Sequence, residues 1–316
     1  MRNSSWPVLA AVVASTLLGP ALRARAVDTR PPPRLRGAIV EFRVVGDLPG
    51  GDELGLTGPE AVAFDHHGNL IIADTGNHRV LIVSEDGVVL DEFGGYGWED
   101  DRLDTPSDVC VYEGFFTYVL DEGNRRVVSY DAQGDYAGLV VAEDEAGTPV
   151  SMAVTPSGGL HLVDVDSQSV ISYSQFDEAL EPVGRFGLDE GGLLDPGAVA
   201  EGPGREIAVA DRGRNSVEVF DEFGARLHSV TAPDTLLPTD VVFDDRGNLI
   251  VADARHGRLL AFARGGGDPT ATLIAPEGLA PTAVAVGLGG RAAVLYGRPA
   301  RIQLLELVHA GETPAR

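Results

Sequence analysis

Short apolar stretches with β-strand alternation, separated by turns rich in Gly, Asp and Asn, run through most of the chain. In residues 68–83, GNLIIADTGNHRVLIV, a turn glycine precedes an apolar stretch ending in Asp74, and a tight polar turn leads to a second apolar stretch. This order predicts a β-hairpin. The theme returns in residues 247–262 as GNLIVADARHGRLLAF. A repeated hairpin indicates an array of identical supersecondary units.

A proline opens each unit and sets the period of the repeat. Six such prolines recur at intervals of 42 to 47 residues: Pro59, Pro106, Pro149, Pro196, Pro238 and Pro281. Fifteen residues after each proline, five units have an aspartate and the sixth has a tyrosine: Asp74, Asp121, Asp164, Asp211, Asp253 and Tyr296. Units of about 45 residues with several short strands match the length of one β-propeller blade.

The sixth unit is one strand short, and the sequence before the first unit offers a spare strand. After residues 302–308 only a short tail remains, whereas residues 38–45, AIVEFRVV, precede Pro59. Pairing these two stretches would close the ring and leave no exposed sheet edge. We therefore predict an all-β fold: a six-bladed β-propeller of four-stranded antiparallel blades over residues 37–308, with the last blade closed by the N-terminal strand.

The repeat resembles the NHL family of propeller repeats. The resemblance rests on the opening proline, the GNLIxAD stretch and the N-x-R turn of residues 74–80 and 121–127. The third and fourth units lack the arginine, and the sixth lacks the aspartate. The resemblance implies that the first strand of each blade lines a central channel. It also implies that the turns between second and third strands share one face, here called the linker face, with the linkers between blades.

Residues 1–26 are predicted to be a secretory signal peptide. Arg2 precedes an apolar run over residues 6–18, and an A-x-A sequence suited to cleavage follows. The run is too short to span a bilayer, although an uncleaved anchor is the alternative. Residues 27–36 are a proline-rich linker, and 309–316 a C-terminal tail. We expect an exported monomer, periplasmic or extracellular, with no membrane insertion after cleavage.

The composition argues against nucleic acid as a partner. The formal net charge is −24, and all 24 basic residues are arginine. Such a chain should repel phosphate backbones, whose binding is dominated by cationic contacts, although some NHL propellers bind RNA through a basic face. The single cysteine, Cys110, excludes an intramolecular disulfide. It is either a small buried residue or a reactive thiol.

Arginines concentrate on the predicted linker face. Nine lie in or beside the turns between second and third strands: Arg79, Arg125, Arg126, Arg212, Arg214, Arg255, Arg258, Arg298 and Arg301. One interpretation is a ring of guanidinium groups that binds carboxylates or an acidic loop of a protein partner. The other is that the aspartates ending the second strands, together with the acidic linkers, neutralise this ring.

The linker after the first blade, residues 94–105, carries Tyr96 and Trp98 beside three acidic residues. Exposed aromatic side chains mark recognition surfaces. A linker aromatic can equally pack under its own blade. The same two residues are the only basis for a third hypothesis, the binding of carbohydrate or cell wall.

Two acidic residues are expected to face the central channel. Asp108 and Asp240 occupy equivalent positions in the first strands of blades two and five, which oppose each other in a six-fold ring. They either hold Ca²⁺ together with waters and carbonyls or cap local backbone groups. No other cofactor is expected.

Motifs typical of catalysis are missing from the sequence. It has no HExxH, G-x-S-x-G or C-x-x-C-H pattern. Amidating lyases with a similar repeat carry zinc-binding histidines directly after the blade-opening prolines, and here none of those positions is histidine. We predict a binding or scaffolding module for a protein partner, not an enzyme. The alternative is a metal-dependent hydrolase or lyase at the channel mouth, using Asp108, Asp240 and Glu60.

Overall fold

The computed structural model describes residues 37–48, 51–112, 114, 116–142, 147–176, 179–186 and 192–311. The predicted signal peptide, the proline-rich linker and residues 312–316 of the tail lie outside the described residues. Within the described part, no helix is long and apolar enough to cross a membrane.

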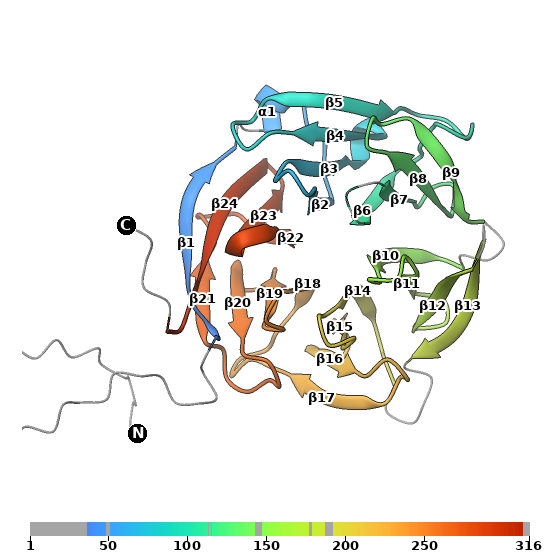
Figure 1. Cartoon of the computed structure of the whole chain (residues 1–316). Coiled ribbons are helices and arrows are strands. Elements are labelled where there is room, and N and C mark those ends of the chain that lie inside the picture. Colours follow the sequence, from blue (N-terminus) through green and yellow to red (C-terminus); the bar gives the residue numbers. More distant parts are fainter. Residues whose placement is uncertain are drawn as a thin grey trace, which may run out of the picture. The chain divides into compact units, whose positions relative to one another are not determined.

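Six four-stranded antiparallel sheets surround a central axis (Figure 1). The first three blades comprise β2 (Ala61–Phe64), β3 (Leu70–Asp74), β4 (Arg79–Val83) and β5 (Val89–Gly94); β6 (Pro106–Tyr112), β7 (Phe116–Asp121), β8 (Arg126–Asp131) and β9 (Tyr136–Val141); and β10 (Pro149–Val154), β11 (Leu160–Asp164), β12 (Ser169–Phe176) and β13 (Ala179–Phe186).

The remaining blades comprise β14 (Pro196–Glu201), β15 (Ile207–Asp211), β16 (Ser216–Phe220) and β17 (Arg226–Val230); β18 (Pro238–Phe243), β19 (Leu249–Asp253), β20 (Arg258–Phe262) and β21 (Ala271–Ile274); and β22 (Pro281–Val286), β23 (Arg291–Gly297), β24 (Ala300–His309) and β1 (Ile39–Asp47). The described helical segments are α1 (Gly51–Leu54), η2 (Thr75–Asn77) and η3 (Leu288–Gly290). The fold is thus the predicted six-bladed propeller.

The hydrophobic core is divided among the interfaces between neighbouring blades. Each cluster of buried apolar residues draws on two adjacent blades, and every adjacent pair around the ring has one. The second strands β3, β11, β15 and β19 are buried at every position. A strand covered on both sides has no polar face, so these strands are mostly apolar up to the aspartate that ends each of them; β11 also contains the buried His161.

The N-terminal strand closes the ring, as predicted. β1 pairs antiparallel with β24, from Ile39 opposite His309 to Asp47 opposite Gln303. Two contacts tie these ends to blade five: His309 Nε2 lies 2.8 Å from Asp244 Oδ2, and Asn248 Nδ2 donates to the carbonyl of Gly37 at 2.8 Å. The hydrogen-bonding edge of β24 is therefore covered by the chain's own N-terminal strand, which becomes the outer strand of the last sheet.

The aspartate that ends each second strand fastens the linker that enters its blade. All five are buried, with at most 4 % of their surface exposed. Each accepts backbone N–H groups about 16 residues upstream; the donors include Thr57 for Asp74, at 2.7 Å, and Asp104 for Asp121, at 2.6 Å. Since buried carboxylates need such donors, the repeat spacing follows from a structural contact between linker and strand.

Candidate functional site

Arg126 shows what the repeated arginine does on the linker face. Its Nε donates to Asp121 Oδ2 at 2.8 Å, and its Nη2 donates to the carbonyls of Glu99 and Arg102 at 2.8 and 2.7 Å. Only 12 % of the side chain is exposed. The guanidinium group therefore joins the blade to the preceding linker.

The equivalent arginines of other blades are engaged in the same way. Arg79 pairs with Asp74 at 2.8 Å and with Glu92 at 2.7 Å, and also donates to carbonyls of the preceding linker. Arg258 pairs with Asp253 at 2.9 Å and also with Asp234. The carboxylates of the repeat thus neutralise the arginines that begin the third strands of blades one, two and five.

Three further arginines of the predicted ring also have protein partners. Arg301 pairs with Asp47, Arg212 with Asp195, and Arg214 with Asp211 and the carbonyl of Gly192. Arg125 adopts a positive φ of 50° in its turn. Arg255 and Arg298 are exposed, and neither has a hydrogen bond or ion pair with any described residue. The charge available to a ligand therefore differs from one arginine to the next.

Tyr96 and Trp98 project from a linker that is held in place. Their exposed fractions are 68 % and 76 %. The linker is fixed by a bridge between Tyr96 and Leu103, by full burial of Leu103, and by N–H donation from Gly95 to the carbonyl of His78 at 2.8 Å. The ring of Tyr96 packs edge-on against His78 at 4.9 Å. The two aromatic rings are thus exposed on an ordered segment.

The close packing of this linker explains its glycines. Gly94 has a φ of +95°, and a Cβ there would stand 2.6 Å from Leu103 Cδ1. Carboxylates accompany the aromatic rings: Glu99, Asp100 and Asp101 are exposed. Within the described chain, Glu99 and Asp100 form no ion pair. We call Tyr96, Trp98, Glu99, Asp100 and Asp101 the aromatic–acidic loop.

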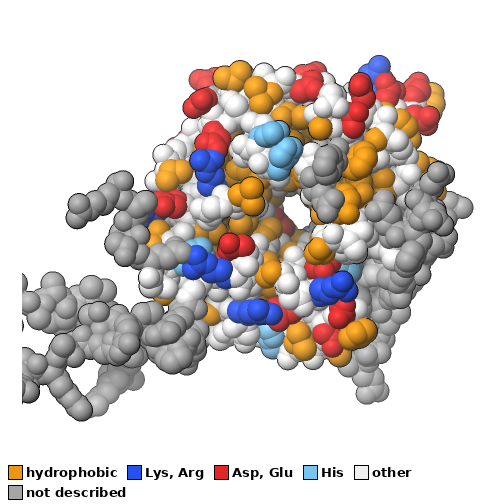
Figure 2. Space-filling model, viewed as in Figure 1, with side chains coloured by type: hydrophobic (Ala, Val, Ile, Leu, Met, Phe, Trp, Pro, Cys, Tyr) orange, Lys and Arg blue, Asp and Glu red, His pale blue; other side chains and the backbone are white. Residues whose placement is uncertain are grey.

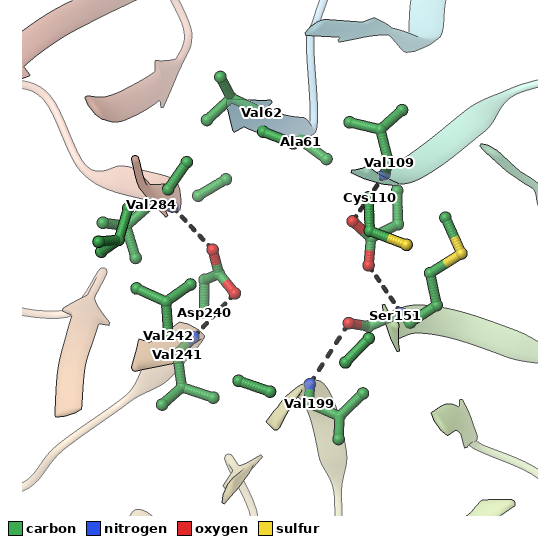
Figure 3. A pocket seen from close by; sticks show the side chains of 18 of the residues that line it. Ala61, Val62, Val109, Cys110, Ser151, Val199, Asp240, Val241, Val242 and Val284 are labelled. Atoms are coloured by element: carbon green, nitrogen blue, oxygen red, sulfur yellow. Dashed lines mark hydrogen bonds between the residues drawn. The ribbon is translucent and has the colours of Figure 1, made fainter. Parts of the chain in front are cut away.

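Asp108 and Asp240 line the central channel, and Figure 3 shows the carboxylate of Asp240 among the residues of the channel wall. Asp108 accepts N–H groups from Val109 at 2.8 Å and from Met152 of blade three at 2.7 Å. Asp240 accepts them from Val241 at 2.8 Å and from Val284 of blade six at 2.7 Å. Each carboxylate thus caps backbone groups of two blades. Calcium binding by this pair stays a prediction.

The channel raises the pKa of both carboxyl groups. Burial raises the pKa of Asp108 to about 6, opposed by its backbone and Ser151 hydrogen bonds. Burial also raises the pKa of Asp240 to about 7, and the charge of Asp108 contributes. Since each carboxylate accepts from only two N–H groups in an enclosed space, the hydrogen bonds do not offset the cost of the buried charge.

Cavities of different volume lie along the channel. One of about 300 Å³ is lined by the two aspartates. A smaller one of about 70 Å³, lined by Glu60 as well as by both aspartates, lies towards the linker face. At the opposite face a cavity of about 540 Å³ is lined by Phe64, Phe243 and Leu288, and the centre of the ring is hollowed in Figure 2.

The comparisons with known proteins agree with this fold. The family model "NHL repeat" matches residues 56–83. The chain therefore contains a match to the NHL repeat in its first blade. It is 25 % identical over 268 residues to human E3 ubiquitin-protein ligase NHLRC1, covering 78 % of this chain and 65 % of that protein. It is also 25 % identical over 134 residues to Protein brain tumor of Drosophila melanogaster, covering 41 % and 12 %. The NHL propeller thus matches less than two thirds of either relative's length.

Solved structures confirm the architecture of the NHL propeller but not an activity. Virginiamycin B lyase from Staphylococcus aureus superposes with a TM-score of 0.60 at 11 % identity, covering 84 % of this chain and 100 % of the lyase. A streptogramin B lyase structure gives 0.60 at 11 % identity, covering 84 % and 97 %. At this identity the likeness concerns the fold alone.

Two polar clusters in the NHL propeller were not predicted from sequence. His161 Nδ1 lies 2.6 Å from Ser172 Oγ, and its Nε2 lies 3.1 Å from Glu201 Oε2. Strand register sets His161 opposite Ser172. The alternation of residues along these two strands could therefore have indicated the His161–Ser172 contact, but not the contact with Glu201. All three side chains are buried. The cluster joins blades three and four and presents no accessible nucleophile.

The second cluster, Asp244, Asp245 and His309, brings three ligand-type atoms within 4.8 Å of one another. The carboxylate of Asp244 already accepts from His309, from Asn248 Nδ2 at 2.6 Å, and from the N–H groups of Arg246 and Asn248 at 2.9 and 2.7 Å. A metal ion would have to displace these donors. The geometry is that of a turn anchor which also fastens the last strand.

Cys110 lies half-buried in the channel wall. Burial raises the pKa of its thiol well above the usual value, and the charge of Asp108 adds to the effect. Because the thiolate is the reactive form, the structure favours the small buried residue over the reactive thiol.

Proposed function

We propose that this NHL propeller is an exported binding and scaffolding module that holds a protein partner against its linker face. The observation that carries the proposal is the aromatic–acidic loop. Tyr96 and Trp98 are exposed on a linker that Arg126 and Leu103 hold in one conformation. Aromatic anchors that need no ordering on binding contribute most to affinity at protein interfaces.

The charge around the loop favours a partner segment that is positively charged. Glu99 and Asp100 have no counter-ion among the described residues, and the whole chain carries −24. A Lys or Arg side chain of the partner gains from the face of the indole ring as well as from these carboxylates. The arginines paired with Asp74, Asp121 and Asp253 act on the partner indirectly, because they shape the linkers.

The proposal is tested by comparing two aromatic truncations on opposite faces. Trp98→Ala removes the loop's largest anchor. Phe223→Ala is the matched control, since Phe223 is 85 % exposed in the turn between β16 and β17. Cross-linked complexes are captured from the native cell envelope with wild type and each variant. Loss of one discrete complex with Trp98→Ala alone supports the proposal; the same complexes with all three proteins contradict it.

A second function, a metal-dependent hydrolase or lyase, has one supporting observation. Asp108 and Asp240 share a cavity of about 300 Å³ and have pKa values of about 6 and 7, and perturbed carboxyl groups in a cavity are typical of catalytic sites. Metal analysis of the purified protein discriminates the two functions. A stoichiometric transition metal that is lost in Asp240→Asn favours the enzyme, and a metal-free protein that still captures its partner favours the binding module.

A further inference from the structure

A second pocket lies on the linker face, where blade six meets blade one. Its volume is about 810 Å³, and it is bounded by the segment around α1 on one side and the turn between β23 and β24 on the other. We call it the seam pocket. Small-molecule sites are commonly about 300 to 1,000 Å³. The seam pocket is therefore large enough for a ligand of amino-acid or dipeptide size.

Two arginines line the seam pocket, and only one of them is paired with a described carboxylate. Arg301 is held by Asp47 through two hydrogen bonds of 3.0 and 2.9 Å. Arg298 is exposed and makes no hydrogen bond or ion pair with any described residue. Its Nη2 lies 3.8 Å from the position that a Cβ on Gly58 would occupy. The Arg298 guanidinium group is thus free to bind an anion at the pocket wall.

Carboxylates face the same space. Glu53 and Glu60 line the pocket, and neither is in an ion pair within the described chain. Burial raises the pKa of Glu60; the charge of Glu122 adds to the effect and that of Arg298 opposes it. Arg298 and Glu60 therefore influence each other without pairing. Glu60 also lines a small cavity of the channel, so this residue borders both the pocket and the channel.

We propose that the seam pocket binds a free amino acid or a short peptide with free termini. Arg298 receives the carboxylate, since a planar guanidinium group offers two parallel N–H donors to it. Glu60 receives the ammonium group, and Glu53 adds a second carboxylate to the lining of the pocket. Among the described residues that line the pocket, Arg298, Glu53 and Glu60 have no ion-pair partner, and this combination of charges suits a ligand that carries both signs. This site is separate from the aromatic–acidic loop, and either can fail without the other.

The experiment measures binding to purified protein by calorimetry, with a mixture of free dipeptides as the probe. The same mixture with N-acetylated or C-amidated termini is the chemical control. We expect the free dipeptides to bind, and blocking either terminus to weaken binding about tenfold or more, because a charge-assisted contact is lost. Equal binding of free and blocked dipeptides, or no binding at 10 mM, which is roughly ten times a weak millimolar Kd, overturns the proposal.

Two variants locate the site. Arg298→Gln and Glu60→Gln should each weaken binding of the free dipeptides about tenfold. Arg255→Gln is the matched control, because Arg255 is likewise exposed, lies in the equivalent turn of blade five, and has no hydrogen bond or ion pair with a described residue. Thermal melting without ligand checks that each variant is folded. Unchanged binding in Arg298→Gln, with that variant folded, also overturns the proposal.

Discussion

The channel aspartates make the stability of the ring depend on pH, and Asp240→Asn is the perturbation that isolates this effect. Asp240 has a pKa of about 7 in the folded protein, against an ordinary value of 3.8 for an aspartate. The pKa of Asp240 is higher in the folded protein than in the unfolded chain, so the folded protein binds this proton more tightly. The resulting contribution to stability is fully present at pH values below the pKa of the unfolded chain. That contribution is lost as pH rises through the folded value. In folded protein the carboxyl group keeps its proton up to near neutral pH, whereas in unfolded chains it ionises near pH 4.

The magnitude follows from the two pKa values. Linkage predicts that Asp240 contributes up to about 3 kcal/mol more stability at pH 5 than at pH 8. Asp108, with a pKa of about 6, contributes up to about 1.5 kcal/mol over the same range. Asparagine cannot accept through its amide nitrogen, so the N–H of Val241 or Val284 loses its acceptor. That loss costs about 1–3 kcal/mol. It adds the same amount at every pH to the difference in unfolding free energy between wild type and Asp240→Asn.

Urea unfolding of wild type and Asp240→Asn between pH 5 and pH 8 measures the effect. We expect the difference in unfolding free energy to be largest at pH 5 and to shrink by up to about 3 kcal/mol towards pH 8. The control is Asp245→Asn, because the Asp245 carboxylate is 82 % exposed. Parallel curves for wild type and Asp240→Asn across this range would refute the reasoning, since the buried carboxyl group would then titrate alike in folded and unfolded chains.

Three further predictions follow from other contacts. Arg126→Ala should lower the unfolding free energy by about 3–5 kcal/mol in urea titration, because it leaves buried Asp121 without its cation; wild-type stability would contradict this. Deletion of residues 37–47 should give aggregated protein in size-exclusion chromatography, because it uncovers the β24 edge, and a soluble monomer would count against that account. If Asp108 and Asp240 bind Ca²⁺, added calcium should raise the melting temperature of wild type but not of Asp240→Asn; an unmoved wild-type value removes the calcium site.

The blade count and the closure could be predicted because both depend on local, repeated features. The spacing from Pro106 to Asp121 reflects one contact, in which the strand-ending carboxylate binds the N–H of the incoming linker, and this contact recurs in five blades. A one-residue change in that spacing would point the carboxylate to the other side of its strand. The constant spacing in the sequence therefore follows from the contact between linker and strand. The additional strand predicted at the N-terminus indicated how the ring closes.

The contacts of side chains across blades could not be predicted in the same way. The carboxylate of Asp108 reaches Met152, and that of Asp240 reaches Val284, each 44 residues further along the chain. His161 meets Glu201 at a separation of 40 residues. No periodic signal marks these pairs, because the partner in two of them is a backbone N–H that every strand offers. The family resemblance implied that both aspartates face the channel, and what they bind was left open.

The arginines show why repeated residues are weak evidence for a binding site. Arg126 and Arg298 both lie on the linker face, but the linker before blade two passes close enough for its carbonyls to accept from Arg126. Arg298 faces the seam pocket instead, where the chain segment that joins β1 to blade one leaves a cavity. The backbone carbonyls of a linker need hydrogen-bond donors. In blade two, Arg126 at the start of the third strand supplies them. The arginine available to a ligand is then one that no linker uses. In this propeller, a free arginine is expected at the seam, where the repeat is broken. The aromatic–acidic loop differs, because its exposed side chains project from a linker that the regular contacts of Arg126 hold in place.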